Sequence, residues 1–114
     1  MHKSKIAGLG FYVPENEVSN FDLEKVMDTS DEWIRERTGI VTRRYGAKHK
    51  ETTSTMGAKA AEKAIENAGI SKEDVDFIIF ATLSPDYYFP GAGVLLQREL
   101  GITGTEIGAL DIRN

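Results

Sequence analysis

The sequence contains no cysteine, which excludes a disulfide framework and a thiolate metal site within its 114 residues. Its longest apolar run, residues 77–81 with Leu83 behind it, is far shorter than the roughly 20 residues of a membrane-spanning helix. No apolar signal region follows the charged N-terminus. Positive charge is in deficit, since 14 Lys and Arg face 18 Asp and Glu, and nucleic-acid readers usually carry a basic stripe. We therefore expect a globular, cytoplasmic protein without nucleic-acid or membrane partners.

The spacing of apolar residues and chain breakers predicts an α/β fold with a mixed or parallel sheet. We expect strands over residues 5–13, 77–83 and 107–112, a short exposed strand or extended loop over 40–45, and helices after Asn20, after residues 29–32, and over 52–68 and 94–100. Residues 77–83 lack polar–apolar alternation, which is typical of a parallel strand buried on both faces. Gly8 and Gly10 indicate a bulge or a close backbone approach.

Polar side chains mark the expected helix ends. Asn20 is predicted to cap one helix, which would carry Leu23, Val26 and Met27 on one face. Thr29 is predicted to cap the next helix, in a capping box with Glu32.

Glycines are placed to end three of these helices: Gly39, Gly69 and Gly101. Asp28, Asp31 and Glu32 are acidic groups near a helix start, so capping and the helix dipole explain them better than acid–base or metal chemistry.

Two other patterns give weak chemical signals. Gly8-Leu9-Gly10 begins a dinucleotide-binding motif, but Val13 stands where the third glycine belongs, so a packed strand glycine is the better interpretation. The two histidines, His2 and His49, lie among lysines without a neighbouring ligand at metal-binding spacing, so we expect solvated side chains.

Two aromatic patterns remain open on physical grounds. Trp33 and Arg37 are four residues apart on an expected helix and therefore share a face. Together they would receive a flat, phosphate-bearing group; alternatively, the tryptophan anchors the helix and the arginine pairs with a carboxylate. The loop over residues 87–90, Tyr-Tyr-Phe-Pro, is either a pocket wall or partner-binding edge, or a loop packed on its own core.

The segment Asp28-Thr29-Ser30-Asp31-Glu32-Trp33-Ile34 is the most specific motif in the chain. Supporting segments occur in order at residues 22–25, 37–40, 51–54, 68–70 and 89–90, and at Asp111. Together, over essentially the whole chain, they resemble β-ketoacyl-acyl-carrier-protein synthase III, a condensing enzyme of the thiolase superfamily.

The resemblance implies a layered α/β/α/β/α thiolase fold, of which residues 1–114 would be the N-terminal part, ending just before the catalytic cysteine. The family transfers a short acyl group from acyl-coenzyme A to that cysteine and condenses it with malonyl-acyl carrier protein, which starts fatty-acid synthesis. The catalytic cysteine, histidine and asparagine would lie outside the chain, so we expect the chain alone to be inactive. The resemblance implies a homodimer and no permanently bound cofactor, with the coenzyme A thioester as substrate.

By the same resemblance, Thr29, Trp33, Arg37 and Thr38 line the coenzyme A entrance, with the tryptophan against adenine. Phe89 would reach across the dimer interface toward the partner's acyl pocket. Two alternatives stay open: a thiolase-fold condensing enzyme that uses longer acyl or aromatic thioesters, and a non-catalytic subunit or scaffold completed by a second chain.

Overall fold

The computed structural model describes residues 3–47, 50–102 and 106–113. The chain divides into two compact units: unit 1 comprises Met1–Tyr12 and Thr52–Asn114, and unit 2 comprises Val13–Glu51. His2 and His49 lie outside the described residues, so the expectation for them stays a prediction.

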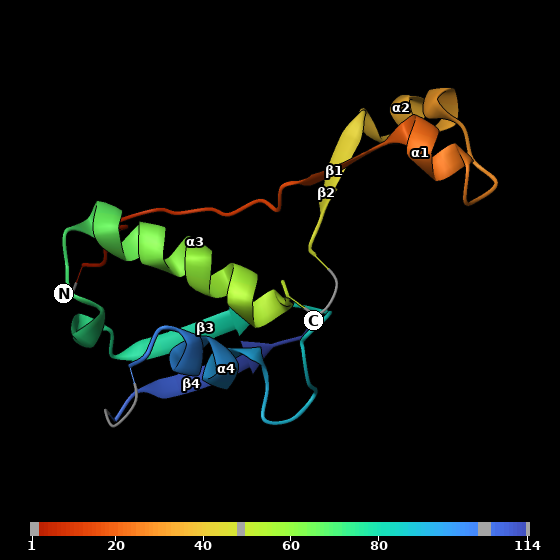
Figure 1. Cartoon of the computed structure of the whole chain (residues 1–114). Helices are drawn as coiled ribbons and strands as arrows, with labels where there is room; N and C mark the ends of the chain where they lie inside the picture. The colour runs from red at the N-terminus through yellow and green to blue at the C-terminus, as the bar shows by residue number, and fades with distance from the viewer. Residues whose placement is uncertain (1–2, 48–49, 103–105, 114) are drawn as a thin grey trace. The chain divides into compact units, whose positions relative to one another are not determined.

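Unit 1 is built on two parallel strands. β3 (Phe77–Ala81) pairs with β4 (Gly108–Ile112), with Phe77 opposite Gly108 and Ala81 opposite Ile112. α3 (Thr53–Ala68), the 3₁₀ turn η1 (Lys72–Asp74) and α4 (Ala92–Glu99) complete the unit. α4 packs against both strands and against α3 (Figure 1). This arrangement confirms the predicted α/β fold with parallel pairing.

The core of unit 1 lies on one face of the β3–β4 pair. Its buried members come from α3, β3, α4 and the segment after α4: Ala58, Ile78, Leu96, Leu100 and Ile102. Ile78 is only 7% exposed, whereas Phe77 and Ile79 are 57% and 63% exposed. The prediction of a strand buried on both faces is therefore wrong for this chain, because its helices cover the sheet from one side only.

Residues 5–13 are extended but pair with no strand in the described part of the chain, so the predicted first strand is also wrong. Instead, the glycines lie directly against α3. A Cβ atom at Gly8 would come within 2.3 Å of the Ala64 carbonyl oxygen, and one at Gly10 within 2.3 Å of the Ala60 carbonyl oxygen. The side-chain amide of Asn67 donates a hydrogen bond of 2.8 Å to the Leu9 carbonyl. The expected close backbone approach is confirmed, with a helix in place of a strand.

Unit 2 combines a two-stranded antiparallel ribbon with two helices. β1 (Asn16–Ser19) is antiparallel to β2 (Thr42–Tyr45), and α1 (Asn20–Glu24) and α2 (Asp31–Thr38) lie between them in sequence. β2 confirms the short strand expected over residues 40–45. β1 was not predicted because its polar sequence, Asn-Glu-Val-Ser, carries no apolar alternation.

The caps of unit 2 lie one residue from their predicted positions. Ser19, not Asn20, caps α1, and it forms a reciprocal capping box with Asp22. Ser30, not Thr29, caps α2, because its hydroxyl oxygen accepts a 3.1 Å hydrogen bond from the Trp33 amide.

The predicted capping box with Glu32 does not form; the Glu24 carboxylate accepts from the Asp31 amide at 2.7 Å instead. α1 ends at Glu24, so Val26 and Met27 lie beyond the helix with exposed side chains, and the apolar face expected there is wrong.

The predicted ends of the longer helices are close to the observed ones. Thr52 caps α3, and Gly69 ends it with a left-handed φ of +66°. Gly39 ends α2 with φ +72°, and Gly101 follows α4 with φ +70°. In the described ranges, every helix falls short of the length and apolar character that a bilayer crossing requires.

Candidate functional site

Trp33 and Arg37 form a stacked pair on the exposed side of α2. The guanidinium carbon of Arg37 lies 4.4 Å from the centroid of the indole ring, within the range of a cation–π contact. Trp33 is 52% exposed, whereas Ile34 is the residue of α2 whose side chain is buried. The expected shared face is therefore confirmed, and the anchoring role that was the alternative for Trp33 falls to Ile34.

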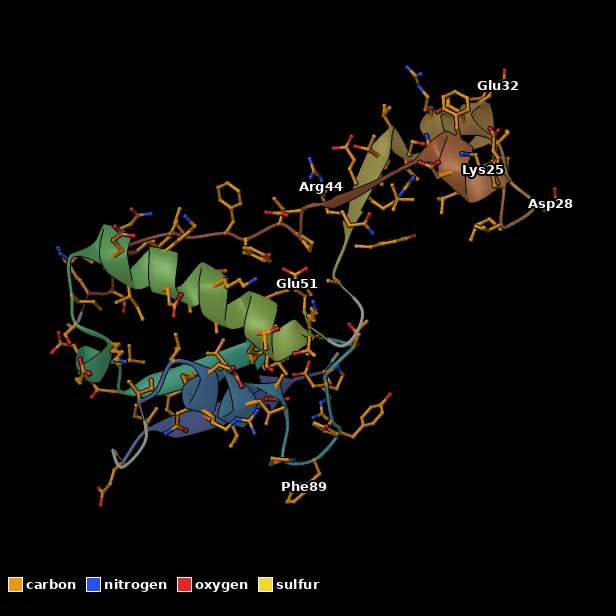
Figure 2. The ribbon with its side chains drawn as sticks, viewed as in Figure 1. Lys25, Asp28, Glu32, Arg44, Glu51 and Phe89 are labelled. Atoms are coloured by element: carbon orange, nitrogen blue, oxygen red, sulfur yellow. The ribbon has the colours of Figure 1, made fainter. Side chains whose placement is uncertain are left out.

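A shallow hollow of about 370 Å³ borders the tryptophan. It is lined by Asp28, Thr29, Ser30 and Trp33. Figure 2 shows the Asp28 side chain extending from the loop that joins α1 to α2. The hollow thus combines an aromatic surface with hydroxyl groups and one carboxylate, which suits a planar group that carries hydrogen-bond donors.

Thr38 lies at the C-terminal end of α2, where its hydroxyl group serves the protein itself. It donates a 2.7 Å hydrogen bond to the Ile34 carbonyl and accepts a 3.1 Å hydrogen bond from the Ile40 amide. Since a hydroxyl has one proton, any ligand contact of Thr38 would be as an acceptor. The structure thus places Thr29 and Trp33 at the hollow and Arg37 against the Trp33 ring, whereas Thr38 lies at the end of the helix.

Asn20 organises the scaffold beneath this face, a role that the sequence did not reveal. Its side chain is fully buried, donates to the Asp31 carboxylate and to the Ile40 carbonyl at 2.8 Å each, and accepts from the Arg43 guanidinium at 2.6 Å. Asp31 also pairs with Arg35 at 3.5 Å. The structure therefore uses Asp31 to hold α2 in place through side-chain contacts, a structural role other than the capping that was predicted for it.

In unit 1, the aromatic loop over residues 84–91 presents its side chains to the outside. Tyr87, Tyr88 and Phe89 are all exposed, and Phe89 most of all, at 90%. Figure 2 shows Phe89 pointing away from the strands. The alternative in which this loop packs its aromatic side chains on its own core is wrong for this chain.

Asp86 anchors the beginning of the aromatic loop to the first turn of α3. Its carboxylate accepts hydrogen bonds from the Thr52 hydroxyl at 2.9 Å, from the Ser54 amide at 3.1 Å and from the Ser54 hydroxyl. Burial by itself would raise the pKa of Asp86, but these hydrogen bonds and one from the Thr53 amide outweigh it and hold the pKa below 3.8. Asp86 is therefore a carboxylate at neutral pH.

Asp111, near the end of β4, performs a similar task for α4. Its two oxygens accept from the Ala92 and Gly93 amides at 2.8 Å each. Burial would raise the pKa of Asp111, but the two amides and the Arg113 guanidinium outweigh it and lower the pKa. Neither Asp86 nor Asp111 was predicted in these roles, because their partners are 18 to 34 residues away in sequence.

Comparison with known proteins gives consistent relatives over almost the whole chain. No family model matches the sequence. A β-ketoacyl-[acyl-carrier-protein] synthase III from Fusobacterium nucleatum is 54% identical over 102 residues, which are 90% of this chain and 31% of that protein. The protein of the same name from Chlamydia pneumoniae is 59% identical over 100 residues, 88% of this chain and 30% of that protein.

Solved structures agree with these sequence relatives. The 3-oxoacyl-[acyl-carrier-protein] synthase III of Aquifex aeolicus superposes with a TM-score of 0.86 at 46% identity, over 96% of this chain and 34% of that chain. A priming β-ketosynthase from the R1128 polyketide pathway superposes with a TM-score of 0.85 at 34% identity, over 96% of this chain and 32% of that chain. The chain spans about a third of the length of the relatives it matches.

Proposed function

We propose that this chain, which is more than half identical to β-ketoacyl-[acyl-carrier-protein] synthase III proteins over about a third of their length, is an N-terminal portion of such an enzyme. We further propose that the complete protein condenses a short-chain acyl-coenzyme A with malonyl-acyl carrier protein. This reaction starts fatty-acid synthesis. The chain has the α/β fold of the thiolase type. The observation that carries the proposal is the exposed Trp33–Arg37 pair beside its hollow, in a sequence more than half identical to relatives of that name.

We propose that this face of α2 receives the nucleotide end of coenzyme A. The indole ring has one face under Arg37 and borders the hollow with its remainder, so an adenine can stack there. The Arg37 guanidinium supplies charge-assisted hydrogen bonds for a phosphate. Thr29 contributes a hydroxyl from the hollow and Thr38 an acceptor at the helix end.

The acyl group of a thioester is normally taken up by a thiolate, which is the reactive form of cysteine. These 114 residues contain no cysteine. We therefore propose that the nucleophile is a cysteine outside them, and that the chain alone acquires no acetyl group from acetyl-coenzyme A.

Intact-mass measurement after incubation with acetyl-coenzyme A tests this step. We expect one acetyl group on the complete protein and none on the 114-residue chain. A stoichiometric adduct on the chain would contradict the proposal, and no adduct on either protein would favour the non-catalytic subunit.

Steady-state kinetics of the complete protein test the role of Trp33. Lost base stacking is worth about 1–3 kcal/mol, so Trp33→Ala should raise the KM for acetyl-coenzyme A by roughly 5- to 150-fold. Acetyl-pantetheine, which lacks the adenine nucleotide, should be turned over as by the wild type. Trp33→Phe keeps an aromatic face, so its KM for acetyl-coenzyme A should lie between those of the wild type and of Trp33→Ala.

An equal loss with both thioesters would return Trp33 to a purely structural role. Arg37→Gln provides the corresponding test of phosphate recognition. Arg37→Gln should raise the KM for acetyl-coenzyme A and leave the KM for acetyl-pantetheine unchanged, because only acetyl-coenzyme A carries phosphate groups.

A second candidate is a priming condensing enzyme that uses longer acyl or aromatic thioesters. It is favoured by the similarity to the R1128 priming β-ketosynthase, which is nearly as close in fold as the Aquifex protein. Comparing kcat/KM for acetyl-, hexanoyl- and benzoyl-coenzyme A on the complete protein separates the two candidates.

We also propose that the protein works in the cytoplasm as a homodimer, in which Phe89 faces the partner's acyl pocket. The 90% exposure of this phenylalanine supports an external partner for it, since removing a large apolar side chain from water is energetically favourable. Sedimentation equilibrium of the complete protein and of Phe89→Asp tests the dimer.

A further inference from the structure

The position of the aromatic loop is not fixed by burial of its aromatic side chains. Tyr87, Tyr88 and Phe89 are mainly in contact with solvent, so the hydrophobic effect contributes little to holding them where they are. Loops without buried side chains are normally the most mobile parts of a fold. Whatever defines the direction of Phe89 must therefore act through polar contacts of the loop.

Within the described residues, the loop is held near both of its ends and at its middle. Asp86 is held by the first turn of α3. At the other end, Gly91 has a φ of +109°, and a Cβ atom there would approach the Asp111 carboxylate to 2.7 Å, so the backbone turns closely over that side chain. Arg113 provides the third contact, through the Tyr88 carbonyl, which directly precedes Phe89 in the sequence.

Arg113 binds the loop at its middle. Its guanidinium donates a 2.8 Å hydrogen bond to the Tyr88 carbonyl and a 3.1 Å hydrogen bond to the Asp111 carboxylate. It also lies 5.5 Å from the centroid of the Tyr88 ring. Less than a third of the Arg113 side chain is exposed, and less than a seventh of the Asp111 side chain, so this charged pair is partly protected from solvent.

We propose that Arg113 is a positioning residue for Phe89: it holds the Tyr88 carbonyl at the end of β4 and thereby fixes where the loop presents the next side chain. An arginine suits this task because its planar fork reaches a carbonyl and a carboxylate at the same time. The consequence for acyl-chain selectivity rests on the proposed function, which places Phe89 at an acyl pocket.

Hydrogen–deuterium exchange of the complete protein tests the positioning directly. Arg113→Gln should raise the exchange rate of the amides in residues 86–89 by about tenfold or more, because a charge-assisted hydrogen bond is lost. Arg113→Lys, which keeps the charge and a donor, should recover part of the protection. Lys63→Gln removes one positive charge from an exposed position of α3 and should leave the loop unchanged. Unchanged exchange in Arg113→Gln would overturn the proposal.

Acyl-chain selectivity gives a readout that a merely stabilising residue would not change. We expect Arg113→Gln and Phe89→Ala each to shift the ratio of kcat/KM for hexanoyl- and acetyl-coenzyme A by about fivefold or more. In the Phe89→Ala background, Arg113→Gln should cause no further shift, because it acts through Phe89. Additive shifts would overturn the proposal. If Phe89→Ala leaves the ratio unchanged, the acyl-pocket role in the proposed function fails, and the exchange rates alone decide whether Arg113 holds the loop.

Discussion

Among single residues, Asn20 joins three separate parts of unit 2 through one buried side chain. One carboxamide satisfies the Asp31 carboxylate, the Ile40 carbonyl and the Arg43 guanidinium. Because the Asn20 side chain is fully buried, its removal leaves these groups without this partner.

We predict that Asn20→Ala lowers the free energy of opening of α2 by about 2–4 kcal/mol. Hydrogen exchange of the α2 amides measures this change. The matched control is Asn16→Ala, at an exposed position of β1, with an expected effect within about 0.5 kcal/mol. Equal effects of the two substitutions would show that the buried hydrogen bonds are not what holds α2.

Asp86 makes the stability of unit 1 depend on pH. Since the pKa of its carboxyl group is lower in the folded protein than the ordinary 3.8, the carboxylate stabilises the fold above that pH. The stabilisation is lost as the pH falls below 3.8 and passes through the pKa of the folded state.

Asp86→Asn should therefore cost about 1–3 kcal/mol at neutral pH and progressively less in acid. Thermal melts at a series of pH values give this difference, with Asp76→Asn, at an exposed position before β3, as the control. A difference that stays constant from neutral pH into acid would show that the charge of Asp86 is not involved.

At the level of elements, the extended segment before unit 2 packs so closely against α3 that it leaves no room for a side chain at Gly10. A methyl group at Gly10 would overlap the Ala60 carbonyl, which is part of the helix backbone and cannot move aside. Gly69 differs, because nothing lies within 4 Å of a Cβ atom there and only its φ of +66° favours glycine.

We predict that Gly10→Ala destabilises unit 1 by about 1–3 kcal/mol through overlap, and Gly69→Ala by about 1–2 kcal/mol through backbone strain. Asparagine separates the two causes: it adopts left-handed conformations readily, so Gly69→Asn should recover stability, whereas Gly10→Asn should be worse than Gly10→Ala. Denaturant titrations measure all four variants, and recovery at both positions would contradict the steric explanation.

Local signals in the sequence were enough for the elements whose ends they define. α3, α4 and β4 were predicted to within about two residues, since glycines and a threonine cap stand directly at their ends. The first strand failed for the opposite reason: residues 5–13 have the composition of a strand, but strand formation needs a partner, and in the described residues these meet α3 instead.

The candidate site follows the same division. The Trp33–Arg37 pair was predictable because helix geometry alone brings positions four apart together. Asp86 and Ser54 are 32 residues apart, and nothing in either local sequence announces their contact. Placement of such polar contacts needs the tertiary structure.

At the scale of the whole molecule, unit 1 exposes apolar side chains from both strands. Phe77 and Ile79 of β3 and Leu110 and Ile112 of β4 are all exposed, which is a large apolar area for a soluble monomer. We predict that the isolated 114-residue chain aggregates or copurifies with a second protein. Size-exclusion chromatography with light scattering tests this, and a monomer with a sharp cooperative melt would contradict it.

Trp33 is the single tryptophan of the chain, and it lies in unit 2, whereas the long helix α3 lies in unit 1. Tryptophan fluorescence therefore reports on unit 2 alone, while the far-ultraviolet circular dichroism of the chain reports mainly on unit 1. When both signals are recorded on the same sample during heating, the unfolding of each unit can be followed separately. Coincident transitions mean that the units unfold as one cooperative body, and separated transitions mean that each unfolds at its own temperature.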